Sequence, residues 1–190
     1  MDIELTTKEK RLLLHIARES ISAELEERRG HFPAPTKTLK TVCGAFVTLH
    51  REGQLRGCIG HITGVKPLYE GVKELALSSA FRDPRFPPLQ KEELNRVDIE
   101  ISVLTPPEKA SPEDVEVGTH GILLQAGPRS GVLLPQVPIE QGWDRLEFLD
   151  NTCRKAGLPA GCWKDENTEL QIFSAIVFGE KETEKESFSQ

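Results

Sequence analysis

The sequence predicts an α+β fold, with a largely antiparallel sheet flanked by helices. Two pairs of short apolar runs are joined by turn residues at positions 51–54 and 127–131, which is typical of β-hairpins. Helical patterns occur between these hairpins but do not alternate regularly with strands, so a parallel βαβ arrangement is disfavoured. The chain has 190 residues, enough for one hydrophobic core or for two intimately packed subdomains.

The N-terminal segment predicts an amphipathic helix. Thr6 and Glu9 have the spacing of a capping box, in which each side chain caps the backbone of the other residue. An apolar face then recurs every four residues, at Leu13, Ala17, Ile21 and Leu25. Gly30 is the expected C-terminal stop, and residues 31–40, which contain two prolines, are expected to form a loop.

The first hairpin is expected to consist of a strand over residues 41–49 and a returning strand that carries residues 55–61. A turn centred between Glu52 and Gly53 places Cys58 opposite Val47 and Cys43 opposite Ile62. Because the two thiols are then not cross-strand partners, no Cys43–Cys58 disulfide is predicted.

The middle of the chain predicts a helix, a rigid loop and a strand. Pro67 suits the first turn of a helix that ends near Phe81 and buries Leu68, Val72, Leu75 and Ser79. Three prolines exclude regular structure from residues 82–89. A short helical turn is expected at 91–95, followed by an alternating strand at 97–103 and another helical turn near 111–116.

The C-terminal part predicts a hairpin, one long helix and a last strand. Residues 122–124 and 132–134 form the arms of the hairpin. One helix over residues 139–156 would place Trp143, Leu146, Leu149 and Cys153 on one face and end at Gly157. Residues 170–178 read as a strand, and residues 179–190 as a polar tail that follows a single domain over residues 1–178.

Composition excludes several classes of protein. The formal net charge of -6 and the pI near 5.5 disfavour nucleic acid as the main partner. The sequence shows neither a signal peptide nor an apolar stretch of membrane-spanning length, so we expect a cytoplasmic protein. The chain has four cysteines: Cys43, Cys58, Cys153 and Cys162. They lack a Cys-x-x-Cys pair, which favours reduced thiols. We expect neither a metal site nor a cofactor.

Residues 55–61, Leu-Arg-Gly-Cys-Ile-Gly-His, are unlike both core and surface sequence. Gly57 and Gly60 bracket the thiol of Cys58, Arg56 stands two positions before it, and His61 follows three positions after it. Glycine permits positive φ or a close backbone approach, at a conformational cost that a plain strand does not normally carry. The stretch therefore predicts a functional site without naming a substrate.

Cys58 and Arg56 each have two interpretations, one functional and one structural. Cys58 is either a nucleophile or proton donor, if a neighbouring cation lowers its pKa, or a small buried hydrophobe. Arg56 either binds an anion or forms a structural clamp to Asp83 or Glu100, because its planar fork suits carboxylates and phosphates.

Further candidates come from outside this stretch. His61 and His120 each neighbour a glycine and are either partners of Cys58 or structural histidines. Asp83 either caps Arg85 or the following turn, or acts as a catalytic acid. Glu100 alternates with the apolar face of its strand, which favours exposure. We count Arg56, Gly57, Gly60, Asp83, Arg85 and Glu100 as candidate binding residues, and Cys58, His61 and His120 as candidate catalytic residues.

Five motifs in order resemble the AMMECR-type domain family, the group called AmmeMemoRadiSam system protein A. They are Leu-Arg-Gly-Cys-Ile-Gly at 55–60, Asp-Pro-Arg-Phe-Pro-Pro-Leu at 83–89, Glu-Ile-Ser-Val-Leu at 100–104, His-Gly-Ile at 120–122 and Leu-Leu-Pro-Gln-Val at 133–137. The resemblance spans about residues 6–178. It implies two α/β subdomains with a cleft near the Arg-Gly-Cys motif. It also implies a Memo-like protein and a radical S-adenosylmethionine enzyme as partners, but no known reaction.

Two hypotheses for function follow. The first is an enzyme or enzyme subunit that binds a small polar or anionic metabolite in the cleft, using Arg56, Cys58 and a histidine. The second is a non-catalytic adaptor that holds those partner proteins through the rigid loop of residues 82–89, which includes Phe86. RNA or nucleotide binding is a third hypothesis, which the overall charge disfavours.

Overall fold

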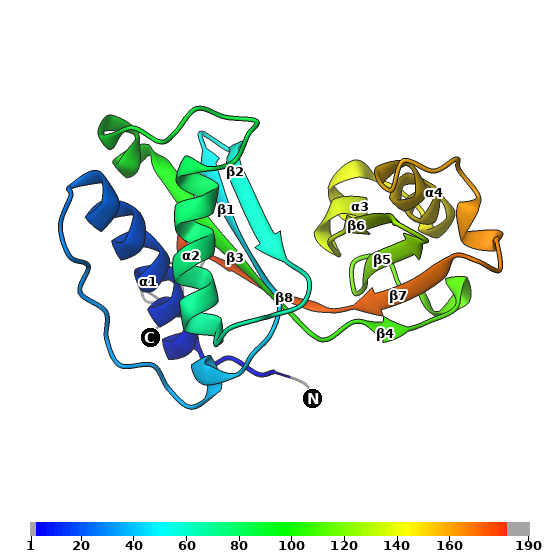
Figure 1. The fold of residues 1–190 in the computed structure, drawn as a ribbon, viewed down its shortest axis with the longest axis horizontal. Helices are drawn as coiled ribbons and strands as arrows, with labels where there is room; N and C mark the ends of the chain where they lie inside the picture. Colours follow the sequence, from blue (N-terminus) through cyan, green and yellow to red (C-terminus); the bar gives the residue numbers. More distant parts are fainter. Residues whose placement is uncertain (1–2, 182–190) are drawn as a thin grey trace. The chain divides into compact units, whose positions relative to one another are not determined.

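The protein has an α+β fold, and the computed structural model describes residues 3–181 (Figure 1). The chain divides into two compact units, of which the second is Leu104–Ala175 and the first holds the described residues before and after it. The first unit contains α1 (Thr7–Leu25), η1 (Thr38–Lys40), β1 (Ala45–Arg51), β2 (Gln54–His61), α2 (Leu68–Phe81), η2 (Lys91–Arg96), β3 (Val97–Leu104) and β8 (Ala175–Gly179), where η marks a 3₁₀ helix.

The first unit is a four-stranded sheet with two helices on one face. Its strand order is β2-β1-β3-β8, and β1 pairs antiparallel with both β2 and β3. Helices α1 and α2 lie side by side against this sheet (Figure 1). Alternate residues of β1 and β3 point towards the helices, as the period of two in a strand requires. They form the core with the apolar faces of the helices: Val47, Leu49, Ile99, Ile101, Leu13, Ala17, Ile21, Val72 and Leu75.

Helix α1 begins as predicted but ends earlier. The backbone N–H of Glu9 donates to Oγ1 of Thr6 at 3.3 Å, and the N–H of Thr6 donates to Oε2 of Glu9 at 3.0 Å, so the capping box is confirmed. The prediction that Gly30 ends the helix is wrong. The helix stops at Leu25, and Glu27 adopts the left-handed conformation with φ of 51°. A non-glycine residue therefore provides the change of direction that we had assigned to a glycine.

The hairpin of β1 and β2 is confirmed, but its register changes by one residue along its length. Glu52 and Gly53 both have positive φ, as a two-residue hairpin turn demands. Beyond the turn, an irregularity between Leu49 and His50 shifts the pairing. Cys58 therefore lies opposite Thr48 instead of Val47. A β-bulge of this kind inserts one residue, and the turn alone does not reveal it.

The second unit is a four-stranded sheet against a helix. It contains β4 (Glu108–Lys109), η3 (Pro112–Asp114), β5 (Gly121–Ala126), β6 (Arg129–Leu133), α3 (Gln136–Gln141), α4 (Arg145–Lys155), η4 (Cys162–Lys164) and β7 (Glu169–Phe173). The strand order is β4-β7-β5-β6, and α4 contacts β5 and β6. The core of this unit is formed by Ile122, Leu124, Phe148, Leu149, Cys153 and Leu170.

Two predicted elements of the C-terminal half are each divided in two. The single helix over 139–156 is wrong because Gly142 adopts left-handed φ of 67° and ends α3, and Asp144 then caps the start of α4. Phe148 consequently takes the buried place that we had given to Leu146, which is exposed. The single strand over 170–178 is interrupted at Ser174, and its halves, β7 and β8, belong to different sheets.

Cys153 and Cys162 form a disulfide, which corrects the expectation of four reduced thiols. Cys153 is at the end of α4, and Cys162 begins η4. Gly157 and Gly161 both adopt positive φ between them and turn the chain back, so that the two Cα atoms lie 5.9 Å apart. Cys43 and Cys58 are free thiols, and the prediction that they are not bonded to each other is confirmed.

The expected polar tail begins within ordered structure. Gly179 ends β8, and the carboxylate of Glu180 accepts hydrogen bonds from the Arg18 side chain and, at 2.9 Å, from the N–H of Ile99. The part of this tail from residue 182 onward lies outside the described residues. None of the helices in residues 3–181 has the length and apolar character needed to cross a membrane.

Candidate functional site

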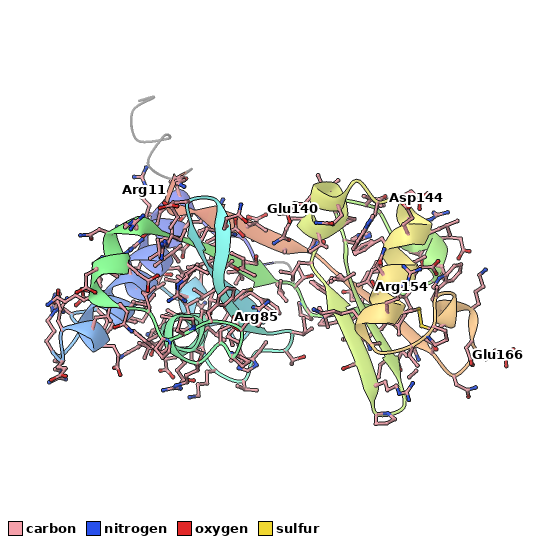
Figure 2. All side chains as sticks on the ribbon, turned by 90° about the horizontal axis from the view of Figure 1, so that it is seen from above. Arg11, Arg85, Glu140, Asp144, Arg154 and Glu166 are labelled. Atoms are coloured by element: carbon pink, nitrogen blue, oxygen red, sulfur yellow. A yellow bond between two sulfur atoms is a disulfide. The ribbon has the colours of Figure 1, made fainter. Side chains whose placement is uncertain are left out.

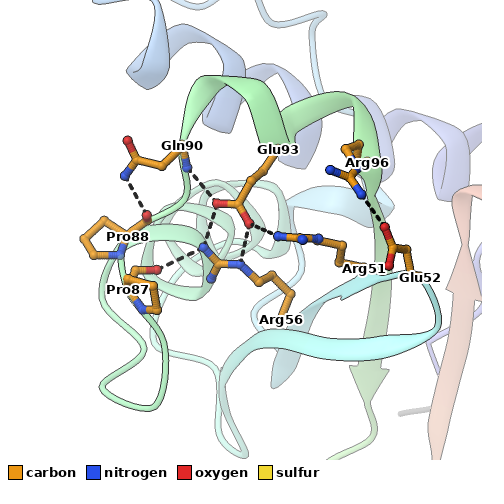
Figure 3. Close-up of polar contacts among 8 residues, drawn as sticks. All are labelled: Arg51, Glu52, Arg56, Pro87, Pro88, Gln90, Glu93 and Arg96. Atoms are coloured by element: carbon orange, nitrogen blue, oxygen red, sulfur yellow. Dashed lines mark hydrogen bonds and ion pairs between the residues drawn. The ribbon is translucent and has the colours of Figure 1, made fainter.

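Arg56 is a buried structural clamp, and its partner is Glu93 (Figure 3). Its Nε and Nη2 donate to the two carboxylate oxygens of Glu93 at 3.0 and 2.9 Å, and Nη2 also donates to the carbonyl of Pro87 at 3.0 Å. Arg51 donates to the same carboxylate at 2.8 Å. These cations hold the pKa of Glu93 at about 2, with the Arg56 hydrogen bonds as the largest cause. The expected clamp to Asp83 or Glu100 is corrected.

The loop that follows α2 is fastened to the exposed edge of β2 at Cys58. The buried carboxylate of Asp83 accepts the N–H of Cys58 at 2.9 Å, and Arg85 donates to the Cys58 carbonyl at 3.1 Å. Asp83 and Arg85 also bond each other, at 2.9 and 2.7 Å; Figure 2 labels Arg85. These side chains bond the backbone N–H and carbonyl of Cys58, which a neighbouring β-strand would otherwise pair with, so no further strand can add to β2 at this point. The prediction that Asp83 caps Arg85 is confirmed.

The ionisation of Asp83 decides whether it can act as a catalytic acid. The Arg85 guanidinium, together with the N–H groups of Cys58 and Arg85, holds the pKa of the Asp83 carboxyl well below its usual range. A general acid needs a proton to donate near its working pH. The ionised carboxylate of Asp83 is suited to bonding the loop, and the geometry gives no support to a role as catalytic acid.

The two glycines of the motif allow close packing. A Cβ on Gly57 would lie 2.2 Å from the carbonyl oxygen of Ser79 in α2, and one on Gly60 would lie 2.2 Å from the Phe46 ring. The Ser79 hydroxyl bridges the hairpin here, since it accepts the N–H of Ile59 at 2.9 Å and donates to the carbonyl of Val47 at 2.7 Å. Gly57 is therefore required for α2 to pack on β2.

Cys58 has a thiol that stays protonated at neutral pH. Burial raises its pKa, and this effect exceeds the opposing ones of the Thr48 hydroxyl, which donates to Sγ at 3.2 Å, and of Arg85. Thr48 pairs with both Cys58 and Glu100, so the three residues stand side by side across β2, β1 and β3. Glu100 is half-buried, although its position in the strand pattern favoured exposure. A resting thiolate nucleophile is disfavoured at Cys58.

The two candidate histidines lie in different units. His61 ends β2 and is exposed. Because it is three positions from Cys58 on one strand, the two side chains leave opposite faces of the sheet. His120 lies in the second unit, where its Nδ1 accepts the N–H of Glu116 at 3.2 Å. His120 thus has the contacts of a structural histidine.

A cavity of about 380 Å³ lies beside the motif, between α2 and the residues that flank the hairpin. Its lining includes His61 from the motif but not Cys58. Leu68 and Leu75 of α2 and Ala45 give it an apolar floor. The half-buried thiol of Cys43 also lines it, and burial raises the pKa of this thiol to about 11.

The rim of this cavity carries unpaired positive charge. Lys66 and Glu74 form an ion pair with each other. Arg82 is exposed at the C-terminal end of α2 and, within residues 3–181, its guanidinium has no hydrogen-bond or ion-pair partner. Since Asp83 is fixed to Cys58, the adjacent Arg82 is held at the cavity by the locked loop.

The described part of the chain contains no cluster of side chains that could coordinate a metal ion. Within residues 3–181, no three His, Cys, Asp or Glu side chains gather closely enough to hold an ion. The arrangement instead offers a hydrophobic hollow, a guanidinium, an imidazole and a protonated thiol. Such a site can bind a small molecule that has an apolar body and an anionic group.

The comparisons with known proteins agree with the motif evidence. Residues 14–178 match the family model described as AMMECR1. The chain belongs to the AMMECR1 family. The family resemblance expected from the five motifs is therefore confirmed. Among its AMMECR1 relatives, protein NEQ441 of Nanoarchaeum equitans is 48% identical over 177 residues, which cover 88% of this chain and 98% of the relative.

Another AMMECR1 relative, protein MK0488 of Methanopyrus kandleri, is 44% identical and covers 97% of this chain and 94% of its own. The fold is similar to the crystal structure of the uncharacterized protein PH0010 from Pyrococcus horikoshii. That structure has a TM-score of 0.86 and 42% identity, and the match covers 93% of this chain and 94% of that chain. These relatives are uncharacterised, so the family assignment gives the fold but no reaction.

Several residues that build this AMMECR1 site escaped the sequence reasoning. Glu93 had a detectable signal, because Gln90 and Glu93 have capping-box spacing and the N–H of Gln90 does donate to the Glu93 carboxylate, at 3.0 Å. Arg82 stands next to the recognised Asp83 motif but was treated only as part of the loop. Cys43 lines the cavity and Ser79 bridges the two strands of the hairpin only because of how α2 packs on the sheet. No local sequence pattern predicts that packing.

Proposed function

We propose that the protein binds a small metabolite with an apolar body and one anionic group in the cavity beside His61. The observation that carries this proposal is the Arg82 guanidinium, which has no partner within residues 3–181 and lies at the rim of a hollow with an apolar floor. An arginine fork recognises carboxylate or phosphate oxygens through two parallel hydrogen bonds. The ligand would place its anionic group at Arg82 and His61, and its apolar part over Leu68 and Leu75.

In this proposal residues 55–60 hold the ligand-binding residues in place and take no part in covalent chemistry. The Arg56–Glu93 clamp and the Asp83–Cys58 bond fix the loop that carries Arg82. Cys43 can donate a hydrogen bond to a bound ligand, because a thiol with a pKa of about 11 keeps its proton. If the family acts on such a metabolite, His61 is the residue at the cavity suited to proton transfer.

The test is ligand-induced stabilisation combined with protection of a thiol. A panel of small carboxylates and phosphate monoesters is screened by thermal shift, and each hit is titrated by calorimetry against the wild type and Arg82→Gln. We expect Arg82→Gln to weaken binding about tenfold, the usual scale for a lost charged hydrogen bond. Arg96→Gln, which removes an exposed arginine outside the cavity, is the matched control.

Protection from alkylation locates the ligand independently. A bound ligand should slow iodoacetamide modification of Cys43, which lines the cavity, and leave Cys58 unchanged, because Cys58 does not line it. If no compound stabilises the protein, or if Arg82→Gln binds every hit as tightly as the wild type, the proposal is wrong.

A second candidate function is an adaptor for a Memo-like protein or a radical S-adenosylmethionine enzyme. The supporting observation is that residues 82–89 form a preorganised surface, with Asp83 buried beneath exposed Arg85 and Pro87. A fixed loop loses little conformational freedom on binding. Phe86 is half-buried, with the Arg56 and Arg85 guanidinium carbons 5.9 and 5.6 Å from its ring centre, so the exposed arginine is the better contact. Loss of partner pull-down in Arg85→Ala, but not in Arg96→Ala, would support this function.

A further inference from the structure

Two adjoining hollows lie along the neighbouring face of α2, next to the cavity at His61. One of about 520 Å³ is lined by α1, α2 and the loop after α1, and the next, of about 510 Å³, by that loop and Lys73. They share Phe32 and Lys73. We call them together the Phe32 groove: Ile16, Arg29, Gly30, His31, Phe32, Pro33, Ala34, Pro35, Tyr69, Glu70, Lys73, Glu74 and Leu77.

One end of the Phe32 groove is cationic. Of the five residues around that hollow, Arg29, His31 and Lys73 carry basic side chains. Lys73 places Nζ 4.2 Å from the centre of the Phe32 ring. Within residues 3–181, neither Arg29 nor Lys73 has a carboxylate partner. Two or three basic groups around one hollow suit a dianion, whereas a single carboxylate needs only one.

Four acidic residues are already engaged: Glu70 and Glu74, which line the groove, and Glu19 and Glu26, which lie near it in the chain. Glu19 accepts both Arg28, at 2.6 and 3.1 Å, and the N–H of His31, at 2.8 Å. Arg28 also binds Glu26, so this arginine uses the carboxylates that would otherwise attract Arg29. Glu70 accepts the Tyr69 hydroxyl at 2.7 Å, and Glu74 pairs with Lys66. The bonds to Glu19 also fix the loop that holds Arg29 and His31.

The other end of the groove contains aromatic rings and apolar side chains beside Glu70, Lys73 and Glu74. Phe32, Pro33, Pro35 and Tyr69 line it, with Ile16 and Leu77 beneath. Aromatic side chains beside prolines form flat walls against which a planar ring can stack. A hollow of about 520 Å³ is within the usual size range of small-molecule sites.

We propose that the Phe32 groove binds a phosphorylated aromatic ligand of mononucleotide size. The phosphate monoester contacts Arg29, His31 and Lys73, and the planar base lies between the loop of Pro33 and Pro35 and the Tyr69 side of α2. This site shares only Glu74 and Leu77 with the cavity at His61, so it is independent of the function proposed for that cavity.

The test is calorimetric titration of the full chain with adenosine monophosphate, adenosine and inorganic phosphate. We expect adenosine monophosphate to bind more tightly than either fragment. Lys73→Gln and Arg29→Gln should each weaken it about tenfold, as expected for loss of one charged hydrogen bond. Both side chains are exposed and form no ion pair within the described residues, so unchanged unfolding temperatures would verify that these variants are intact.

The controls separate this site from the cavity at His61. Arg82→Gln removes an arginine from the His61 cavity without releasing a carboxylate into the groove, and should leave the affinity unchanged. Phe32→Leu keeps an apolar side chain but removes the ring, and should weaken the binding of adenosine monophosphate more than that of inorganic phosphate. The inference is overturned by no binding at millimolar nucleotide, by equal affinity for inorganic phosphate, or by loss of binding in Arg82→Gln but not in Lys73→Gln.

Discussion

Arg56 and Glu93 form a two-point ion pair that ties β2 to the 3₁₀ helix before β3. Both oxygens of Glu93 are used, at 3.0 and 2.9 Å from the guanidinium, and the Arg56 side chain is only 9% exposed. Buried charges are costly unless they are paired and hydrogen-bonded, and within residues 3–181 only Nη1 of this guanidinium lacks a partner. The pair also holds the Pro87 carbonyl, so the loop beside Cys58 depends on it.

We expect Glu93→Gln to lower the free energy of unfolding by about 3 kcal/mol, because it leaves the Arg56 charge buried without its partner. Arg56→Lys should also destabilise, since an ammonium cannot reproduce the fork. Urea unfolding followed by circular dichroism measures both. The control is Glu52→Gln, which breaks the exposed pair with Arg96 and should cost less than about 0.5 kcal/mol. Equal effects of Glu93→Gln and Glu52→Gln would contradict the clamp.

Acid should destabilise the protein over a defined range of pH. The pKa values of Glu93 and Glu9 are lowered from 4.5 to about 2, by the Arg56 hydrogen bonds and by the Thr36 hydroxyl as the largest causes. A depressed pKa contributes stability that is fully present above the unfolded value and is lost as the pH falls through the folded one. The urea midpoint should therefore stay level from pH 6 to about 5 and fall between about 4.5 and 2. Glu93→Gln should reduce that slope; an unchanged slope would refute the assignment.

Gly57 and Gly71 provide a matched pair of substitutions. Gly57→Ala places a Cβ 2.2 Å from the backbone carbonyl oxygen of Ser79, so α2 must move, and we expect a loss of about 2–4 kcal/mol. Gly71 lies within α2 with open space at its Cβ position, and Gly71→Ala should stabilise by about 0.5–1 kcal/mol through helix propensity. Thermal unfolding of both variants measures the difference. A harmless Gly57→Ala would mean that the close approach is not required.

Local patterns predicted the fold best where one signal decided the structure. The capping box of Thr6 and Glu9, the turn at Glu52 and Gly53, and the buried face of α2 were all read from a few adjacent residues. The division at Gly142 was missed because the apolar pattern continues across it. The break at Ser174 was missed because β7 and β8 join different sheets, and sequence alternation does not distinguish sheets.

The contacts made by residues 55–61 were predicted only in part. Within residues 55–61, which the sequence singles out, Arg56, Gly57 and Cys58 all make specific contacts in the fold. Their partners Glu93 and Ser79 lie on other elements, 37 and 22 positions further along the chain than Arg56 and Gly57. Which of several carboxylates meets an arginine depends on tertiary packing, and one sequence does not contain that choice.

The disulfide should stabilise the second unit. A bond between Cys153 and Cys162, nine positions apart, restricts the unfolded chain by about 2–3 kcal/mol in the loop-entropy account. Both tryptophans, Trp143 and Trp163, belong to this unit, so tryptophan fluorescence reports its unfolding. Reductant should lower the fluorescence-detected unfolding temperature of the wild type and have no effect on Cys162→Ser. A wild-type midpoint that is insensitive to reductant would argue against the bond.

The reactivity of the free thiols distinguishes a structural motif from a nucleophilic one. Burial raises the pKa of both Cys43 and Cys58, in Cys43 to about 11, so iodoacetamide should modify both slowly at pH 7 and faster as the pH rises. Thr48→Val removes the hydroxyl that donates to Sγ of Cys58 while keeping the shape of the side chain. Because that bond favours the thiolate, Thr48→Val should slow alkylation of Cys58 further and leave Cys43 unchanged. Mass spectrometry of each cysteine peptide against pH gives the two rates. If Cys58 instead reacts at a pH-independent, thiolate-like rate from pH 6 upward, the motif contains an activated nucleophile and the positional role inferred for it is wrong.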